Sequence, residues 1–334
     1  MNLKPIQPTI SVIIVSWNAR DYLKQCLASL TVETCRYPME IIVVDNASTD
    51  GSPECVESEY PDVHLIRNAD NLGFSKANNI GVSASTGDYL CFVNSDVKVL
   101  PDCITRLVGY CEDHLEAGIV GPRILGGDGL LQRSCRGFPS VWNMFCRALA
   151  LDSIFIKSKL FTGYTLRYWP QNSLCEVDIL TGCFWLVRRQ ALNEVGLLDE
   201  TFFIYGEDMD WCKRFWTKGW KVVFVPSAEA IHYGGGSSSN APVRFYIERN
   251  KADLHYWIKH HSVFTVACYL LISFLHMLLR VIGYSFVVLL NPAESGGRYK
   301  VKRSLACLKW ILLSRIVKNE IPLSESIVLD PEKV

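Results

Sequence analysis

Three carboxylates fall within four positions at Glu207, Asp208 and Asp210, where the sequence predicts a helix over 208–218. The helix dipole favours acidic residues at the start of a helix, which accounts for one or two of these three carboxylates without any catalytic role. Crowded carboxylates also raise one another's pKa, and a raised pKa suits a general base that accepts a hydroxyl proton. We therefore assign Asp208 as the candidate base and Glu207 as the group that orients the acceptor or substitutes as base. Asp210 and Arg214, four residues apart on the helix, are expected to pair.

A metal site is predicted from Asp96, which follows the apolar run at 89–93. A diphosphate brings negative charge, and Mg²⁺ or Mn²⁺ held by one or two carboxylates plus phosphate oxygens neutralises it. Such an ion also stabilises charge on a departing nucleotide diphosphate. His232 stands just after a predicted strand and before the glycine run 234–236. A lone histidine is usually structural, but here a neutral imidazole is expected to complete the metal shell, with the glycines letting the loop close.

Polar residues also end the first two predicted strands. Residues 16–20 read Ser-Trp-Asn-Ala-Arg, which has neither the dinucleotide glycine fingerprint nor a phosphate-binding P-loop. Nicotinamide and P-loop chemistry are thereby disfavoured, as is a nucleotidyltransferase with a basic triphosphate loop. Asp45 can accept hydrogen bonds from a base or ribose, although such a residue alone is as often a turn former. Asn94 ends a third strand with a polar side chain, which strengthens the prediction of a binding edge.

Strands that alternate with helices must position these residues. Near-continuous apolar strands are expected at 10–16, 40–45, 63–67 and 88–93, with helices behind residue 18 or 21, at 53–59 and at 75–84. This pattern predicts a doubly wound α/β fold with a mostly parallel sheet, whose ligands gather at the carboxyl ends of the strands. A helix at 102–114 and a strand at 118–121 follow, then an aperiodic segment at 123–175 that we interpret as an acceptor-side insertion. Regular structure resumes at 177–187, with a helix after Arg188 and a strand at 220–225.

The bulk composition narrows the class of protein. The 334 residues are 49% hydrophobic and 20% charged with a positive mean hydropathy, which excludes a disordered chain and favours membrane contact. The 34 basic and 34 acidic residues balance, so no nucleic-acid partner is indicated. The 13 cysteines are scattered singly, which favours reduced, buried thiols in the cytosol over a zinc ribbon or a disulfide framework.

The C-terminal region has a different character. Residues 263–290 form a run of 28 residues interrupted only by His276 and Arg280, long enough to span a bilayer. A helical hairpin packed on the catalytic domain is the alternative. Between 296 and 318 lie seven basic residues and no acidic one, among apolar residues. This pattern predicts a basic amphipathic helix at an anionic membrane surface.

Seven motifs in order resemble the inverting family 2 glycosyltransferases with the GT-A fold, most closely the rhamnosyltransferase-like branch that builds bacterial surface polysaccharides. They span residues 10–237 and read VIIVSWNARDYLKQCLASL, EIIVVDNASTDGS, NADNLGFSKANNIG, YLCFVNSD, VDILTGCFWLVRR, GLLDETFFIYGEDMDWCKR and AIHYGGGSS. The resemblance implies a GT-A domain over 1–242, with the insertion at about 123–175, and a helical, membrane-associating region over 243–334.

The resemblance also implies roles for individual residues. The base would be Asp208, the metal ligand Asp96, and the anomeric configuration would invert. The residues expected to line or adjoin the nucleoside and donor pocket are Ser16, Asn18, Asp45, Asp50, Gly73, Lys76, Asn79 and Asn94. The family's metal motif is often acidic-x-acidic, whereas this chain has Asn94 in the first position. This departure implies either a weaker metal affinity or a more important His232.

Substrates follow from the resemblance alone. It implies dTDP-rhamnose as donor and a glycan or polyprenyl-diphosphate-linked acceptor. A nucleotide-sugar donor and reduced thiols together predict the cytoplasmic face of the cell membrane, with the protein peripheral or anchored by its C-terminal region. A UDP-hexose donor and a catalytically inactive nucleotide-sugar-binding scaffold are the alternatives. The sequence does not define the donor, linkage or oligomeric state.

Overall fold

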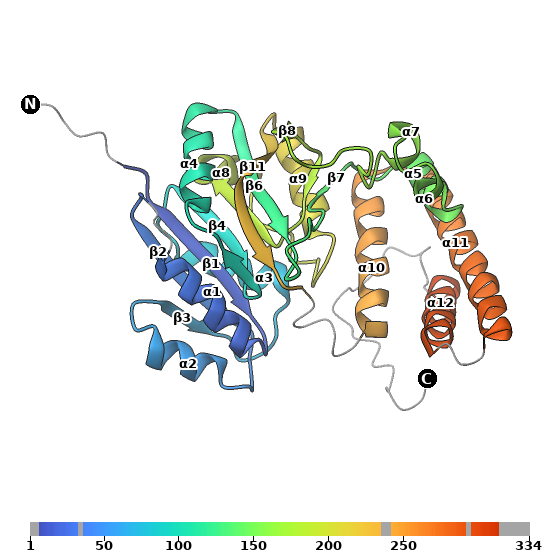
Figure 1. Ribbon diagram of the computed structural model, residues 1–334, viewed down its shortest axis with the longest axis horizontal. Helices are drawn as coiled ribbons and strands as arrows, with labels where there is room; N and C mark the ends of the chain where they lie inside the picture. The colour runs from blue at the N-terminus through green and yellow to red at the C-terminus, as the bar shows by residue number, and fades with distance from the viewer. Residues whose placement is uncertain (1–6, 33–35, 235–241, 292–294, 314–334) are drawn as a thin grey trace, which may run out of the picture.

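A nine-stranded mixed sheet organises the N-terminal two thirds of the computed structural model (Figure 1). The structure describes residues 7–32, 36–234, 242–291 and 295–313. The strand order is β3-β2-β1-β4-β10-β6-β11-β5, with β8 paired to β11. The expected α/β fold with helices on a mostly parallel sheet is therefore confirmed.

The first half of the sheet is parallel, as predicted. The strands are β1 (Ile10–Ser16), β2 (Met39–Asp45), β3 (His64–Arg67) and β4 (Tyr89–Asn94). The helices between them are α1 (Arg20–Val32), α2 (Ser52–Glu59) and α3 (Phe74–Ala84). Ser16 pairs in register with Asp45, and Val15 pairs with Asn94, so the polar strand ends lie along one edge.

The second half departs from a purely parallel arrangement. β10 (Phe184–Arg188) runs antiparallel to both β4 and β6 (Ala117–Leu125). β11 (Lys221–His232) runs parallel to β6 and antiparallel to β5 (Val97–Val99) and β8 (Cys175–Glu176). The strand predicted at 220–225 is longer in the structure, because a register shift between Val225 and Glu229 accommodates Pro226 and the strand continues to His232.

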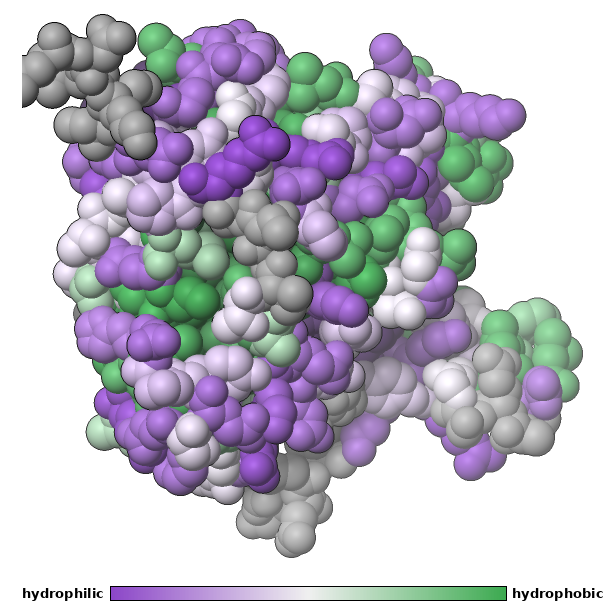
Figure 2. Space-filling view, turned by 60° about the vertical axis from the view of Figure 1, so that its left-hand side comes forward, coloured by the Kyte–Doolittle hydropathy of each residue, from purple (hydrophilic) through white to green (hydrophobic). Residues whose placement is uncertain are grey.

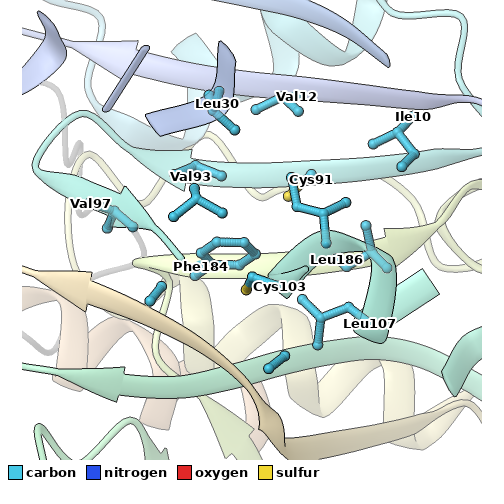
Figure 3. Packing of buried hydrophobic residues seen from close by; sticks show 14 of the residues in the cluster. Ile10, Val12, Leu30, Cys91, Val93, Val97, Cys103, Leu107, Phe184 and Leu186 are labelled. Carbon is cyan, nitrogen blue, oxygen red and sulfur yellow. The ribbon is translucent and has the colours of Figure 1, made fainter. Parts of the chain in front are cut away.

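Apolar side chains fill both faces of the sheet. On one face, Phe184 packs in the same cluster as Val93 and as Cys103 and Leu107 of α4 (Cys103–Asp113), as Figure 3 shows. On the other face, fully buried Trp185 packs against Trp211 of α9 (Glu207–Thr217). The predicted helix after Arg188 is α8 (Arg189–Val195). The sheet is thus covered on both sides and leaves its strand ends for function.

The insertion forms short elements of its own. β7 (Cys135–Arg136) pairs with β9 (Ile179–Leu180) in a small second sheet. Three short helices follow β7: α5 (Val141–Ala148), α6 (Leu151–Ile154) and α7 (Lys159–Thr162). Helices of four to eight residues are too short to show clear hydrophobic periodicity.

Three helices end the described chain: α10 (Pro242–His260), α11 (Val263–Leu290) and α12 (Ser295–Leu313). α11 has the predicted bounds of the apolar run. By length and composition it is the one helix of the described residues that could cross a membrane, and most of it is unburied. Figure 2 shows a largely hydrophilic surface, with hydrophobic residues also gathered at the right-hand edge. The predicted basic helix begins as α12, and residues 314–318 lie outside the described chain.

α10 is joined to the sheet through a shared core. Tyr256 and Trp257 of α10 are fully buried in the cluster that contains Trp211 of α9 and Trp185 of β10.

All 12 cysteines in the described residues are free, and ten of them are buried. The burial predicted for these cysteines is thus found for most of those in the described residues.

Candidate active site

Two buried polar atoms at the strand ends have no partner within the described protein. Asp45 is 2% exposed; its Oδ2 accepts a hydrogen bond from Ser48 N at 2.9 Å, while its Oδ1 has none. The hydroxyl of buried Ser16, in register with Asp45 on the next strand, also lacks a partner. Buried polar atoms are nearly always hydrogen-bonded, so these two are poised for an external polar group.

The loops after β1 and β2 hold each other. Asn18 has a left-handed backbone, with φ of 49°, and its Oδ1 accepts from Thr49 N at 2.8 Å. Asp50 accepts from Arg20 N at 2.8 Å and from both the N–H and the hydroxyl of Ser52. Burial raises the pKa of Asp50, but the hydrogen bonds from Ser52 and Arg20 outweigh it and hold the pKa below its ordinary value. These contacts fix the rim of the pocket around Asp45.

Gly73, at the start of α3, packs closely against the loop that precedes α9. Its φ is 82°, and a Cβ there would lie 2.5 Å from Phe203 O. The next residue, Phe74, donates its N–H to the same carbonyl at 2.7 Å. Asn46, beside Asp45, donates its side-chain amide to Gly73 O at 3.1 Å. The pocket rim is thereby connected to the segment that carries Glu207 and Asp208.

The remaining residues predicted near the donor differ in their surroundings. Asn79 is buried, exchanges hydrogen bonds with both backbone groups of Leu198 and donates to Glu200, so its amide is used within the fold. Lys76 is exposed on α3. Asn94 ends β4 and donates its backbone N–H to Cys183 O at 3.0 Å.

Asp96 and His232 converge although 136 residues separate them in the sequence. His232 Nε2 lies 3.2 Å from Asp96 Oδ1, and Tyr233 N donates to Asp96 O at 3.0 Å. The other ring nitrogen, Nδ1, is 3.0 Å from Gln132 Oε1, a position that suits Nδ1–H donation and leaves the Nε2 lone pair for a metal. Two ligands at ~2.1 Å and right angles from an ion stand ~3 Å apart, so the pair fits a hard divalent cation.

Asp208 is held both by the N-terminal turn of α9 and by an ion pair. Asp208 is nearly buried in the first turn of α9, and its Oδ1 accepts from Met209 N at 2.8 Å. Its Oδ2 forms an ion pair with Arg136 of β7. Arg136 also donates to Tyr164 Oη at 3.2 Å. The carboxylate is therefore held in place by both the helix start and the insertion.

Glu207 occupies a different environment from its neighbour. Its side chain is buried, and its Oε2 has no hydrogen-bond partner in the described structure. Burial, and then the charge of Asp208, raises the pKa of Glu207 to about 8. The prediction that the crowded carboxylates shift one another is confirmed for Glu207, which is mostly protonated at neutral pH.

Asp210 connects two helices through buried ionic contacts. It is fully buried and pairs with Arg214 at 2.8 Å, as predicted. It also contacts Lys259 and His260 of α10, each at 2.7 Å. Burial acts to raise its pKa, but the hydrogen bond with His260 and the charges of Arg214 and Lys259 lower the pKa to about 2. Asp210 therefore ties α9 to α10.

Sequence reasoning missed three polar partners that lie in the insertion: Arg136, Tyr164 and Gln132. All three stand in the insertion, where no periodicity or motif marked them, and each reaches its partner across 28 to 100 residues. Within the described residues no group of three or more His, Cys, Asp or Glu forms a closed metal cage. Asp96 and His232 are the two side chains here that could hold a divalent ion, with its remaining positions left to a substrate or water.

Comparison with known proteins identifies the family of the chain. The glycosyl transferase family 2 sequence model matches residues 11–196, and that of glycosyl transferase family group 2 matches 160–314. The chain is 32% identical over 265 residues to an N-acetylglucosaminyl-diphospho-decaprenol L-rhamnosyltransferase of Mycobacterium tuberculosis, covering 76% of this chain and 85% of the relative. It is 29% identical over 237 residues to rhamnosyltransferase WbbL of Escherichia coli, covering 67% of this chain and 83% of the relative.

A solved structure shares the fold. The mannosyltransferase PcManGT of Pyrobaculum calidifontis, solved with GDP-Man and Mn²⁺, superimposes with a TM-score of 0.55 at 16% identity. The alignment covers 93% of this chain and 89% of that one. A family match over more than half of the chain and a relative above 30% identity lead to one conclusion: this chain belongs to glycosyl transferase family 2 and is a glycosyltransferase.

Proposed function

We propose that the protein transfers L-rhamnose from dTDP-rhamnose to a hydroxyl of a sugar carried on a polyprenyl diphosphate, with inversion at the anomeric carbon. The observation that carries the catalytic part is Asp208, a nearly buried carboxylate fixed at the start of α9 beside a protonated neighbour. The donor and the acceptor are proposed from the two relatives, whose names state rhamnosyl transfer and, for one, an N-acetylglucosaminyl-diphospho-decaprenol substrate.

Asp208 acts as the general base. The Oδ2 atom of Asp208 accepts a hydrogen bond from Arg136. A carboxylate oxygen has two lone pairs, so one remains for a hydrogen bond from the hydroxyl of the acceptor sugar. The acceptor proton moves to Asp208 as its oxygen bonds to the anomeric carbon, and the bond from that carbon to the diphosphate oxygen breaks. Glu207 is protonated at neutral pH and therefore offers an O–H donor that orients the acceptor.

A divalent ion, Mg²⁺ or Mn²⁺, would be held by Asp96 and His232. The donor set of one carboxylate oxygen and one imidazole nitrogen 3.2 Å apart, with Gln132 on the far ring nitrogen, fits it. When bound, the ion neutralises charge on the diphosphate. Asn94 stands where the family often has a second carboxylate, and its neutral amide leaves His232 as the partner of Asp96.

The nucleoside lies against Asp45 and Ser16, whose buried oxygens lack partners. Asn18 and Asp50 shape this pocket through the contacts between the two loops. Gly73 and Asn79 fix the neighbouring start of α3 and the 198–206 segment, and the exposed Lys76 offers a positive charge to the diphosphate.

The protein works at the cytoplasmic face of the cell membrane, peripheral or held by its C-terminal helices. α11 supplies an apolar surface long enough for this purpose, and α12 adds basic residues. The proposed transferase domain comprises residues 1–242, and the proposed membrane-associating region comprises residues 243–334. The buried α10 residues Tyr256 and Trp257 link the two.

A donor panel tests the proposed function. Full-length protein is offered dTDP-rhamnose, UDP-glucose, UDP-galactose, UDP-GlcNAc and GDP-mannose with Mn²⁺ or Mg²⁺, with and without a polyprenyl-diphosphate-linked GlcNAc. Release of dTDP that requires the lipid-linked acceptor, together with a rhamnosylated lipid in mass spectrometry, is the expected result. Turnover with a UDP-hexose and none with dTDP-rhamnose would overturn the proposed donor.

A further inference from the structure

The three short helices of the insertion expose an unusual number of large apolar side chains. We name residues 141–162, which comprise α5 to α7, the aromatic insert. Large hydrophobic residues of this segment that are exposed are Trp142, Phe145, Leu149, Ile154, Phe155, Ile156 and Leu160. Soluble monomers rarely leave such contiguous apolar surface in water, and an exposed patch of this kind marks an interaction site.

The apolar side chains form an ordered cluster. The rings of Phe155 and Phe161 stack with centroids 4.8 Å apart, and Trp142 lies 5.9 Å from Phe145 and 6.1 Å from Phe161. Trp142 Nε1 donates to Leu160 O at 2.9 Å, which ties α5 to α7. The patch is therefore a pre-formed aromatic surface.

Charge around the insert has one sign. Between residues 129 and 175 the chain has six basic residues and one acidic residue, Asp152. Asp152 is buried, whereas Arg147, Lys157 and Lys159 are exposed. An apolar surface with a basic rim complements an anionic bilayer, in which aromatic rings enter the interface and cations meet lipid phosphates.

The insert is continuous with α11. α5 packs directly on α11, and in Figure 1 α5, α6 and α7 gather beside the upper part of that helix. α11 itself exposes Phe264, Leu271 and Ile282, among other apolar residues. The apolar surface thus extends from the C-terminal helix onto the catalytic domain.

The base of the insert is fixed at the proposed catalytic residue. Arg136, just before it, pairs with Asp208 and with Tyr164, just after it. Gly137 N donates to Tyr164 O at 2.9 Å, and a Cβ on Gly137 would lie 2.2 Å from Gly163 O. The two ends of the insert therefore meet beside Asp208.

We infer that the aromatic insert docks on an anionic lipid bilayer and so sets the height of Asp208 above the membrane. The inference rests on the proposed function, since a lipid-anchored acceptor presents its sugar at a fixed distance from the bilayer surface. Contact through α11 alone would attach the protein to the bilayer without fixing the height of the active site above it. The insert adds a second contact, joined to the base through Arg136.

Vesicle binding tests the inference without any sugar nucleotide, so its failure is separate from failure of the transfer reaction. Full-length protein is mixed with phosphatidylcholine vesicles that contain or lack phosphatidylglycerol, some of it brominated on the acyl chains. We expect brominated vesicles to quench fluorescence of the wild type more than that of Trp142→Phe. We also expect the double variant Phe155→Ser/Ile156→Ser to bind anionic vesicles at least about tenfold more weakly.

The control is Leu115→Ser, which removes a more exposed apolar side chain between α4 and β6. It should bind as the wild type does. Equal quenching of wild type and Trp142→Phe, with unchanged binding of the double variant, would show that α11 alone holds the bilayer and would overturn the inference. So would light scattering that shows a dimer lost in the double variant, because the patch would then cover a second copy of the chain.

Discussion

Arg136 and Asp208 form an ion pair between β7 and the first turn of α9, and this pair joins the insertion to the proposed base. Met209 N holds the other carboxylate oxygen at 2.8 Å. Neighbouring Glu207 is buried without a cation of its own, and its pKa is raised to about 8. The two adjacent carboxyl groups thus differ: Arg136 and Met209 hold Asp208 in place, whereas burial raises the pKa of Glu207.

This division predicts opposite results for two conservative substitutions. Asp208→Asn keeps the size of the side chain but removes the base, and should lower kcat by about 10²–10⁴-fold while donor binding persists. Glu207→Gln resembles the protonated acid and should keep kcat within about threefold of the wild type at pH 7. Steady-state kinetics and calorimetric donor binding measure both. Wild-type turnover in Asp208→Asn would remove Asp208 from the base role.

Stability should depend on pH through Glu207. The unfolded chain releases this proton near pH 4.5, whereas the folded protein keeps it until about pH 8. Wild-type stability therefore falls as pH rises through this window, by at most about 1.4 kcal/mol per pH unit. Glu207→Gln does not ionise, so it should gain stability relative to the wild type between pH 5 and 8. Urea unfolding at several pH values tests this, and parallel curves would contradict it.

Sequence pattern gave correct elements where the signal was local. α11 has the bounds of the apolar run, and β1 and β2 end at the predicted Ser16 and Asp45. The strand to His232 was cut short because a bulge, which absorbs Pro226, has no signature in composition. Arg136, Lys259 and His260 were missed because each meets its carboxylate through tertiary packing, 49 to 72 residues away.

Loss of Gln132 should weaken the metal site without removing a ligand. Its Oε1 orients the His232 ring through Nδ1, and outer contacts of this kind change metal affinity by about 10–100-fold. Mn²⁺ binding to Gln132→Ala, followed by electron paramagnetic resonance, should weaken accordingly, and more so in Asp96→Ala. Lys98→Ala, at an exposed position on β5, is the control. Equal Mn²⁺ titrations for all four proteins would argue against an Asp96–His232 site.

Asp210→Asn should destabilise the fold while sparing catalysis. The substitution leaves Arg214, Lys259 and His260 around a neutral buried group, and breaking a buried pair costs about 3–5 kcal/mol. The stabilisation is present above pH 3.8 and is lost as pH falls through about 2. Urea unfolding should show the loss at pH 7, with kcat per folded molecule retained. A drop in kcat without a drop in stability would place Asp210 in the chemistry.

Gly73→Ala should displace the loop that leads to Asp208. The alanine takes on a left-handed φ of 82° and also sets its Cβ 2.5 Å from Phe203 O. Gly219→Ala is a matched control, since its φ is 85° and no atom lies within 4 Å of the added Cβ. Gly219→Ala should lose about 1–2 kcal/mol of stability through backbone strain. Gly73→Ala should lose more, because its Cβ also clashes with Phe203 O. Only Gly73→Ala should also lower kcat, because Phe203 must move and α9 begins four residues later. Equal kcat in the two variants would mean that the Gly73 contact does not position the base.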